Sequence, residues 1–106
     1  MNLKTQKKFE IRARVMKALA HPTRLFIVDE LSRRKKCVNE LAEMVEIDMS
    51  TMSKHLSILK NAGIIRDQKE GLNVYYSLRS PCVLNFFKCI ETVIATNARE
   101  NLSLIG

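Results

Sequence analysis

One stretch of the chain, residues 38–61 (VNELAEMVEIDMSTMSKHLSILKN), limits most strongly what the rest can fold into. Each half of it has apolar residues at helical spacing along one side. They are Val38, Leu41, Ala42 and Val45 in the first half, and Met52, Leu56 and Leu59 in the second. Residues 46–47 make a short connection, and Asp48 is a good N-cap for the segment that follows. Two short amphipathic helices joined by a tight turn predict a helix-turn-helix.

The residues on the outward side of the second predicted helix are small and polar, apart from one lysine. Its residues are Ser50, Thr51, Ser53, Lys54 and Ser57. A helix with hydroxyl groups and a base near its start suits insertion into the major groove of DNA.

The chain is basic, with 18 lysines and arginines against 11 acidic residues and a formal net charge of +7. Such an excess favours nucleic acid or an anionic membrane as partner. No apolar run approaches the roughly 18 residues that a bilayer span needs. The first ten residues are charged and lack the apolar core of a signal peptide. We therefore expect a single domain, residues 1–106, in the cytoplasm and without a membrane partner.

Three further helices are expected, two before the central stretch and one after it. Residues 9–20 have an apolar pattern that can pack either on a partner chain or on the chain's own core. The motif His21-Pro22 starts the next helix, and the basic loop after it, residues 32–36, is either a solvated turn or a phosphate contact. The last helix, residues 81–97, is expected to begin at Ser80 as N-cap, and its broad apolar stripe favours burial against another copy.

A β-hairpin is predicted between the central stretch and the last helix. Residues 64–68 and 73–78 have strand character, and residues 69–72 supply the turn. A hairpin directly after a reading helix is a wing, and its Arg66, Lys69 and Asn73 can follow the DNA backbone, although a plain surface hairpin has the same pattern. The predicted fold is mainly α with a small β-hairpin, a winged helix-turn-helix of order α-α-α-α-β-β-α.

Three segments together resemble the ArsR/SmtB family of winged-helix repressors: LAHPTRLFIVDEL, CVNELAEMVEIDMSTMSKHLSILKNAGII and EGLNVYYSL. The resemblance extends over roughly residues 13–95. It implies a homodimer with residues 9–20 and 81–97 as dimerisation helices, bound to a near-palindromic double-stranded operator and released by an inducer. It also implies that the DNA-reading residues are Met49, Ser50, Thr51, Ser53, Lys54 and His55. For His55, the alternative is a half-buried side chain that braces the helix.

The cysteines are the candidate inducer site. Family members of the zinc-sensing type use Asp and His pairs on the last helix, and residues 81–97 contain neither. The segment KKCVNEL resembles the ELCVCDL motif of arsenite and cadmium sensors, with Cys37 at the first cysteine but Asn39 at the second. Cys82 and Cys89 are candidates for the missing ligands.

Seven residues of helix separate these two sulfurs by about 10.5 Å, whereas two sulfurs on one ion lie within roughly 4 Å. Ligands from different segments or subunits, or an irregular helix at residues 80–82, are therefore needed.

We expect a homodimeric operator-binding repressor, not an enzyme, with Cys37, Cys82 and Cys89 as ligands of a thiophilic ion. Thiolates favour arsenite, antimonite or cadmium, and arsenite is the first choice. One alternative keeps the fold and makes the trigger a disulfide or persulfide. Inert packing of the thiols and a basic protein-interaction module remain further alternatives. A thiol enzyme is disfavoured, since the chain lacks a C-x-x-C pair.

Overall fold

A computed structural model describes residues 1–105 of the chain and gives five helices and three short strands within that range. In chain order they are α1 (Leu3–Leu19), α2 (Pro22–Leu31), β1 (Lys36–Cys37), α3 (Val38–Val45), α4 (Met49–Asn61), β2 (Ile65–Glu70), β3 (Asn73–Leu78) and α5 (Val83–Ile105). The predicted winged helix-turn-helix order is confirmed, and β1 is an addition to it.

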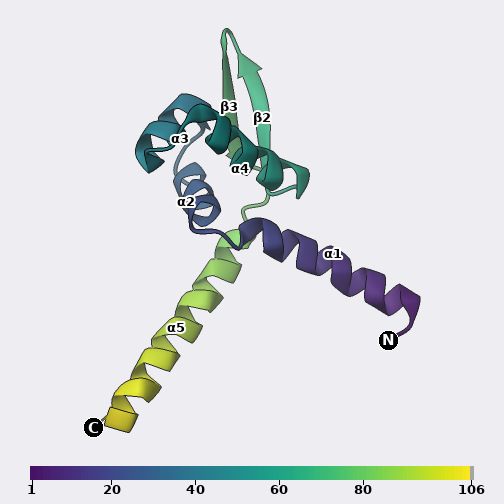
Figure 1. Ribbon diagram of the computed structural model, residues 1–106, viewed down its shortest axis with the longest axis vertical. Coiled ribbons are helices and arrows are strands. Elements are labelled where there is room, and N and C mark those ends of the chain that lie inside the picture. The colour runs from purple at the N-terminus through teal and green to yellow at the C-terminus, as the bar shows by residue number, and fades with distance from the viewer. Residues whose placement is uncertain (106) are drawn as a thin grey trace.

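The molecule has a body and two arms (Figure 1). Helices α2, α3 and α4 form the body, and the β2–β3 hairpin projects from one side of it. Helices α1 and α5 leave the opposite side in different directions, so that most of each lies away from the body. We call α1 and α5 the arm helices.

The hydrophobic core lies within the body. Its buried residues come from the end of α1, from α2, α3 and α4, and from the start of β2: Ala18, Leu19, Ile27, Val28, Leu31, Leu41, Ala42, Met52, Leu56, Leu59, Ile64 and Ile65. The stripe predicted for α4 (Met52, Leu56 and Leu59) is fully buried. Helix α5 contributes no buried residue, although Val83, Leu84 and Phe87 at its start pack against the core.

The sheet is antiparallel, with strand order β1-β3-β2. Lys69 pairs with Val74 and Glu70 with Asn73, so both belong to strand β2. The predicted four-residue turn is therefore too long: only Gly71 and Leu72 connect the strands, and Gly71 has a φ of +63°. Strand β1 is the third strand, at the edge beside β3, where Lys36 pairs with Tyr76 and Cys37 with Tyr75.

The ends of both arm helices differ from the prediction. Helix α1 begins at Leu3 rather than at residue 9, because the Asn2 side chain accepts a hydrogen bond from the Thr5 N–H at 2.8 Å. Helix α5 begins at Val83 and continues to Ile105 rather than ending at residue 97. The predicted N-cap residue Ser80 does not cap it, since its hydroxyl donates to the Gly63 carbonyl at 2.8 Å.

The basic residues of the loop at residues 32–36, predicted as a solvated turn or a phosphate contact, form ion pairs within the protein. Each of the four pairs with a carboxylate: Arg33 with Asp29 and Glu30, Arg34 with Glu40, Lys35 with Glu70, and Lys36 with Glu30. Lys36 is also buried, with 6% of its surface exposed. Exposed pairs of this kind add little stability each, but they offset the positive charge that a phosphate contact would use.

Candidate nucleic-acid interface

The turn between α3 and α4 is built by local backbone chemistry. Helix α3 ends at Val45, and its C-cap residue Glu46 takes the left-handed conformation with a φ of +61°. Asp48 then caps α4 as predicted: one of its oxygens accepts from the Thr51 N–H at 2.9 Å and the other from the Thr51 hydroxyl at 2.6 Å. These bonds hold the pKa of Asp48 below its usual value, with the hydroxyl bond as the largest cause. The cap orients the first turn of α4 relative to α3.

The first two turns of α4 present the predicted reading residues outward. Met49, Ser50, Thr51, Ser53 and Lys54 are all exposed. Met52, Leu56 and Leu59 are buried and fix the opposite side of the same helix to the core. The Thr51 hydroxyl proton is used by the Asp48 cap.

His55 differs from the other predicted reading residues. It is half-buried, its Nδ1 lies 3.2 Å from Nη1 of Arg24, and its ring centroid lies 4.6 Å from that of His21. Burial, then the neighbouring His21, then Arg24 lower the pKa of His55 below its ordinary value. This geometry favours the bracing role for His55, and the DNA contact stays a prediction.

The wing lies beside α4 (Figure 1). Both acids of β2 are paired elsewhere: Asp67 with Lys60 of α4 at 2.9 Å and Glu70 with Lys35 at 2.6 Å. The Asp67 carboxylate raises the pKa of Lys60. The predicted contact residues Arg66, Lys69 and Asn73 are exposed. The wing thus exposes the basic residues Arg66 and Lys69, and its two acidic side chains pair with α4 and with the basic loop.

The three cysteines are not brought together within one chain. Cys37 is half-buried at the N-cap of α3, where its N–H donates to Glu40 at 3.2 Å. Cys89 is exposed on α5, and Cys82 is exposed in the turn before that helix. Over residues 1–105, no three His, Cys, Asp or Glu side chains lie close enough to hold a metal ion.

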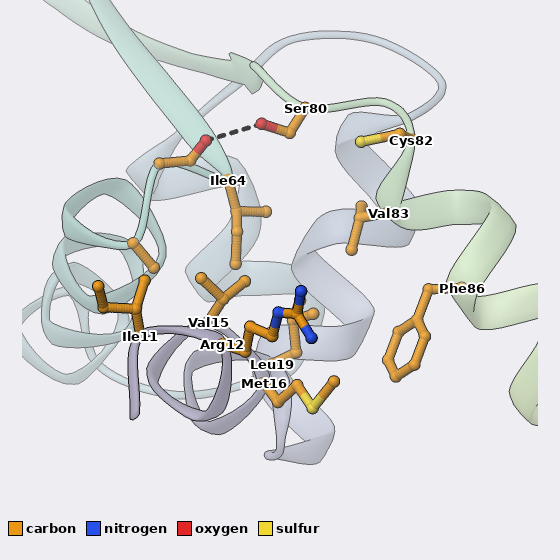
Figure 2. A pocket seen from close by; sticks show the side chains of 12 residues that line it. Ile11, Arg12, Val15, Met16, Leu19, Ile64, Ser80, Cys82, Val83 and Phe86 are labelled. Atoms are coloured by element: carbon orange, nitrogen blue, oxygen red, sulfur yellow. Dashed lines mark hydrogen bonds between the residues drawn. The ribbon is translucent and has the colours of Figure 1, made fainter. Parts of the chain in front are cut away.

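Cys82 also borders a cavity of about 510 Å³ between α1, the end of α4 and the start of α5. Figure 2 shows that its lining is mostly aliphatic, with Val15, Ile64 and Val83 among the side chains and Arg12 as the charged one. The cavity lies where the two arm helices meet the body, so it is bounded by the segments expected to form the dimer.

Known proteins with similar sequences decide the family. The model of the bacterial regulatory protein, arsR family, matches residues 21–67, which contain α2, α3, α4 and the start of the wing. The transcriptional repressor PagR of Bacillus anthracis is 32% identical over 82 residues, which cover 76% of this chain and 82% of PagR. The chain belongs to the ArsR family.

A second relative and a solved structure extend the comparison. A cadmium resistance transcriptional regulatory protein CadC homolog of Staphylococcus aureus is 46% identical over 67 residues, which are 62% of this chain and 55% of that protein. The structure of the homodimeric winged helix-turn-helix DNA-binding domain Mb0332 from Mycobacterium bovis, described as a possible ArsR-family regulator, matches with a TM-score of 0.79 at 27% identity. That match covers 94% of this chain and 93% of Mb0332.

These likenesses identify the ArsR-family chain as a DNA-binding transcriptional repressor with a winged helix-turn-helix fold, and not as an enzyme. Within residues 1–105, none of its helices combines the length and the apolar character that crossing a membrane requires.

Sequence reasoning missed two features of this ArsR-family surface. Strand β1 is only two residues long, too short for any alternation to be read from the sequence, yet it joins the N-cap of α3 to the wing. The second feature is Arg24, which contacts His55 across 31 positions of the chain. No local sequence pattern indicates a contact between residues so far apart in the chain.

Proposed function

We propose that the chain is a homodimeric repressor that binds a near-palindromic operator and leaves it when a thiophilic ion, arsenite in the first place, binds its cysteines. The observation that carries the DNA-binding part is the exposed polar start of α4 beside a wing that exposes Arg66 and Lys69. Helix α4 of each subunit enters the major groove, and each wing follows the adjacent backbone. The half-sites are about 10 base pairs apart, or a multiple of that distance.

The arm helices support the homodimer. Helix α5 is 23 residues long and contains no buried residue, and apolar side chains are exposed along both arms: Phe9, Ile11, Val15, Met16, Phe86, Ile90, Val93 and Ile94. An exposed apolar surface of this extent marks an interface in a protein that stays in solution. The Mb0332 domain, described as homodimeric, aligns with nearly the whole chain.

The chemistry of the thiols supports a soft ion as inducer. Cys37, Cys82 and Cys89 are free, and thiolates prefer arsenite, antimonite or cadmium to harder ions. The described residues of one chain hold no cluster of three ligands, so the proposed site is completed by the second subunit. Cys37 precedes α3 directly, and an ion bound there acts on the helix that supports α4. The likeness to a protein named for cadmium resistance agrees with this class of inducer.

A second candidate trigger is oxidation of the same thiols to a disulfide or persulfide. The observation that favours it is the separation of the three cysteines within residues 1–105. A disulfide needs two sulfurs and a persulfide needs one, so neither requires the three-ligand site that one chain lacks. Cys82 and Cys89 are also exposed, as reagents in solution require.

A gel-shift titration of the reduced protein under anaerobic conditions distinguishes these triggers. The operator is a duplex first selected from a random-sequence pool with the wild-type protein. We expect arsenite or cadmium to release the DNA and polysulfide to leave it bound. Release by polysulfide alone would favour the oxidative trigger. Absence of binding to any duplex, or binding without a steep dependence on salt, would contradict the DNA-binding proposal itself.

The variant Cys82→Ser, with Ser103→Ala as a matched surface control, tests the thiol assignment. We expect C82S to bind the operator as the wild type does and to remain bound when arsenite is added. A variant that is still released at the wild-type arsenite concentration would exclude Cys82 as a ligand.

A further inference from the structure

Arg24 of α2 contacts both an arm helix and the reading helix. Its Nε donates to the Ala18 carbonyl at 2.7 Å, and its Nη2 donates to the Lys17 carbonyl at 3.4 Å. Both carbonyls belong to the last turn of α1, where helix carbonyls lack partners within the helix and the helix dipole favours a cation. The remaining nitrogen, Nη1, lies 3.2 Å from Nδ1 of His55 on α4.

The contact with Arg24 determines which nitrogen of His55 carries the proton. An arginine side chain donates hydrogen bonds and cannot accept them. Nδ1 of His55 must therefore accept, and the neutral ring carries its proton on Nε2. The same reasoning applies to His21, whose Nδ1 accepts from the Thr23 N–H at 3.1 Å and caps α2. The two neighbouring rings are thus held as a pair of Nε2–H donors.

These constraints disfavour two other uses of the histidine pair. A metal-bound imidazole normally donates a hydrogen bond from its second nitrogen, whereas both Nδ1 atoms here face donors. Protonation of His55 would end its bond with Arg24 and set a second cation beside the guanidinium. The groups that face His55 are Arg24 from α2 and His21 from the segment before α2, and both lower its pKa, after burial as the largest cause.

We propose that Arg24 is a positioning residue for DNA binding: it fixes His55 as an Nε2–H donor and holds the reading helix α4 in register with the arm helix α1. The proposal rests on the proposed function, in which α1 helps to join the subunits and α4 reads the operator. In a symmetric dimer, the angle between these two helices decides the distance between the two reading helices. One guanidinium group that bonds to both helices controls that angle directly.

The first test measures the tautomer of His55 by long-range proton–nitrogen NMR in the protein without DNA. In the wild type we expect a protonated Nε2 and an unprotonated Nδ1. In Arg24→Gln we expect a mixture of tautomers and a raised pKa of His55. Arg24→Lys keeps the positive charge without the planar group of donors, so we expect a mixture of tautomers as in R24Q but a smaller rise in the pKa of His55. An unchanged His55 spectrum in R24Q would overturn the proposal, whether or not the protein binds DNA.

The second test is a double-mutant cycle on affinity for the selected operator duplex. His55→Phe removes the accepting nitrogen and keeps an aromatic ring against His21. We expect R24Q and H55F each to weaken binding about tenfold, and the double variant to bind about as well as either single one, because coupled residues are not additive. Losses that multiply in the double variant would mean that Arg24 does not act through His55.

Thermal unfolding separates positioning from a merely structural role. A variant that loses operator affinity only in proportion to its unfolded fraction at the assay temperature would overturn the proposal. If the wild type binds no duplex while its NMR spectrum shows the expected tautomer, the proposed function fails and the Arg24–His55 interaction stands by itself.

Discussion

At the residue scale, Glu40 joins the basic loop to the start of helix α3. Its carboxylate accepts from Arg34 of the basic loop at 2.8 Å and from the Cys37 N–H at the start of α3 at 3.2 Å. The hydrogen bond from Arg34, followed by that from the Cys37 backbone, lowers the pKa of Glu40 from its ordinary value of 4.5 to about 2. The candidate inducer thiol and the helix that supports α4 therefore share one charged neighbour.

This lowered pKa predicts a dependence of stability on pH. A carboxyl group whose pKa is depressed by folding stabilises the protein above its unfolded pKa, and the effect is lost as the pH falls through the folded pKa. We therefore expect Glu40→Gln to be less stable than the wild type at pH 7. The difference in unfolding free energy should shrink below about pH 4.5 and vanish near pH 2. Urea unfolding at several pH values measures it, with Glu43→Gln on the same helix as control. A constant difference across this range would contradict the assignment.

The second residue prediction concerns the reading face. Ser53→Ala combined with Lys54→Ala should weaken operator binding about 10- to 100-fold, because direct contacts to bases and phosphates are worth roughly 1–3 kcal/mol each. Loss of one phosphate contact by Lys54 should also reduce the slope of affinity against salt by about one. Fluorescence anisotropy across a range of salt concentrations provides both quantities.

The matched control removes the same chemical groups far from α4, as Ser103→Ala with Lys88→Ala on α5. It should bind as the wild type does. Equal affinity of the α4 variant and this control would mean that the reading residues lie elsewhere.

Residue roles were predictable where they depend on near neighbours in the chain. Asp48 was recognised as the cap of α4, since this function involves only residues within about one helical turn. The prediction that Ser80 caps α5 was wrong, because its hydroxyl donates to the carbonyl of Gly63, 17 positions away. Lys36 was missed for a related reason: its burial depends on Tyr76 and on Glu30, which only the folded sheet and α2 bring beside it.

At the element scale, the junction between α4 and the wing depends on Gly63. Its φ of +80° suits glycine, and a Cβ added there would lie 3.0 Å from Nη1 of Arg79. The backbone of this turn is closed by bonds from the Gly63 N–H to Lys60 and from the Ile64 N–H to Leu59. The direction in which the wing leaves α4 is set by these few atoms.

The variant Gly63→Ala should therefore destabilise the protein, by about 1–3 kcal/mol for the left-handed backbone and by a further amount for the displaced Arg79. Gly71→Ala is the matched control, since it has a φ of +63° but open space around the added Cβ. We expect both variants to lower the urea midpoint, and G63A to lower it more. Equal effects would show that Arg79 moves aside without cost.

The sequence located the helices of the body better than it located the start of α1 or the contacts between segments. Helices α2, α3 and α4 have apolar faces that must meet one another, so periodicity located them. The first turns of α1 bury no residue, and a polar, lysine-rich segment gives no apolar pattern by which to place its start. The strand β1 and the ion pairs of the basic loop arise from contacts between segments, and no local pattern encodes them.

At the scale of the whole molecule, the body buries its apolar residues within one chain, whereas most apolar residues of the arm helices are exposed. Most core residues lie in the body, and the rest come from the end of α1 and the start of the wing, whereas α5 extends 23 residues with no buried side chain. Helical packing of a second subunit on both arms would cover the apolar residues and would enclose the cavity beside Cys82. In the proposed function, an inducer bound at the thiols would change the angle between the subunits, and with it the spacing of the two α4 helices that must match the operator.

The last prediction tests whether α5 forms the dimer. Ile90 and Ile94 lie one helical turn apart on α5 and have 43% and 61% of their surface exposed. Ile90→Glu combined with Ile94→Glu leaves the core of the body intact and places two charges in the expected interface, where they would lose their hydration without a partner. We expect a folded monomer by sedimentation velocity, with operator affinity reduced by at least about 100-fold, because a monomer contacts one half-site only.

Lys88→Glu with Thr92→Glu changes the opposite side of the same helix and should remain dimeric. A dimer that persists in I90E/I94E would place the subunit interface away from this side of α5, and the proposed site shared by thiols of two subunits would have to move with it.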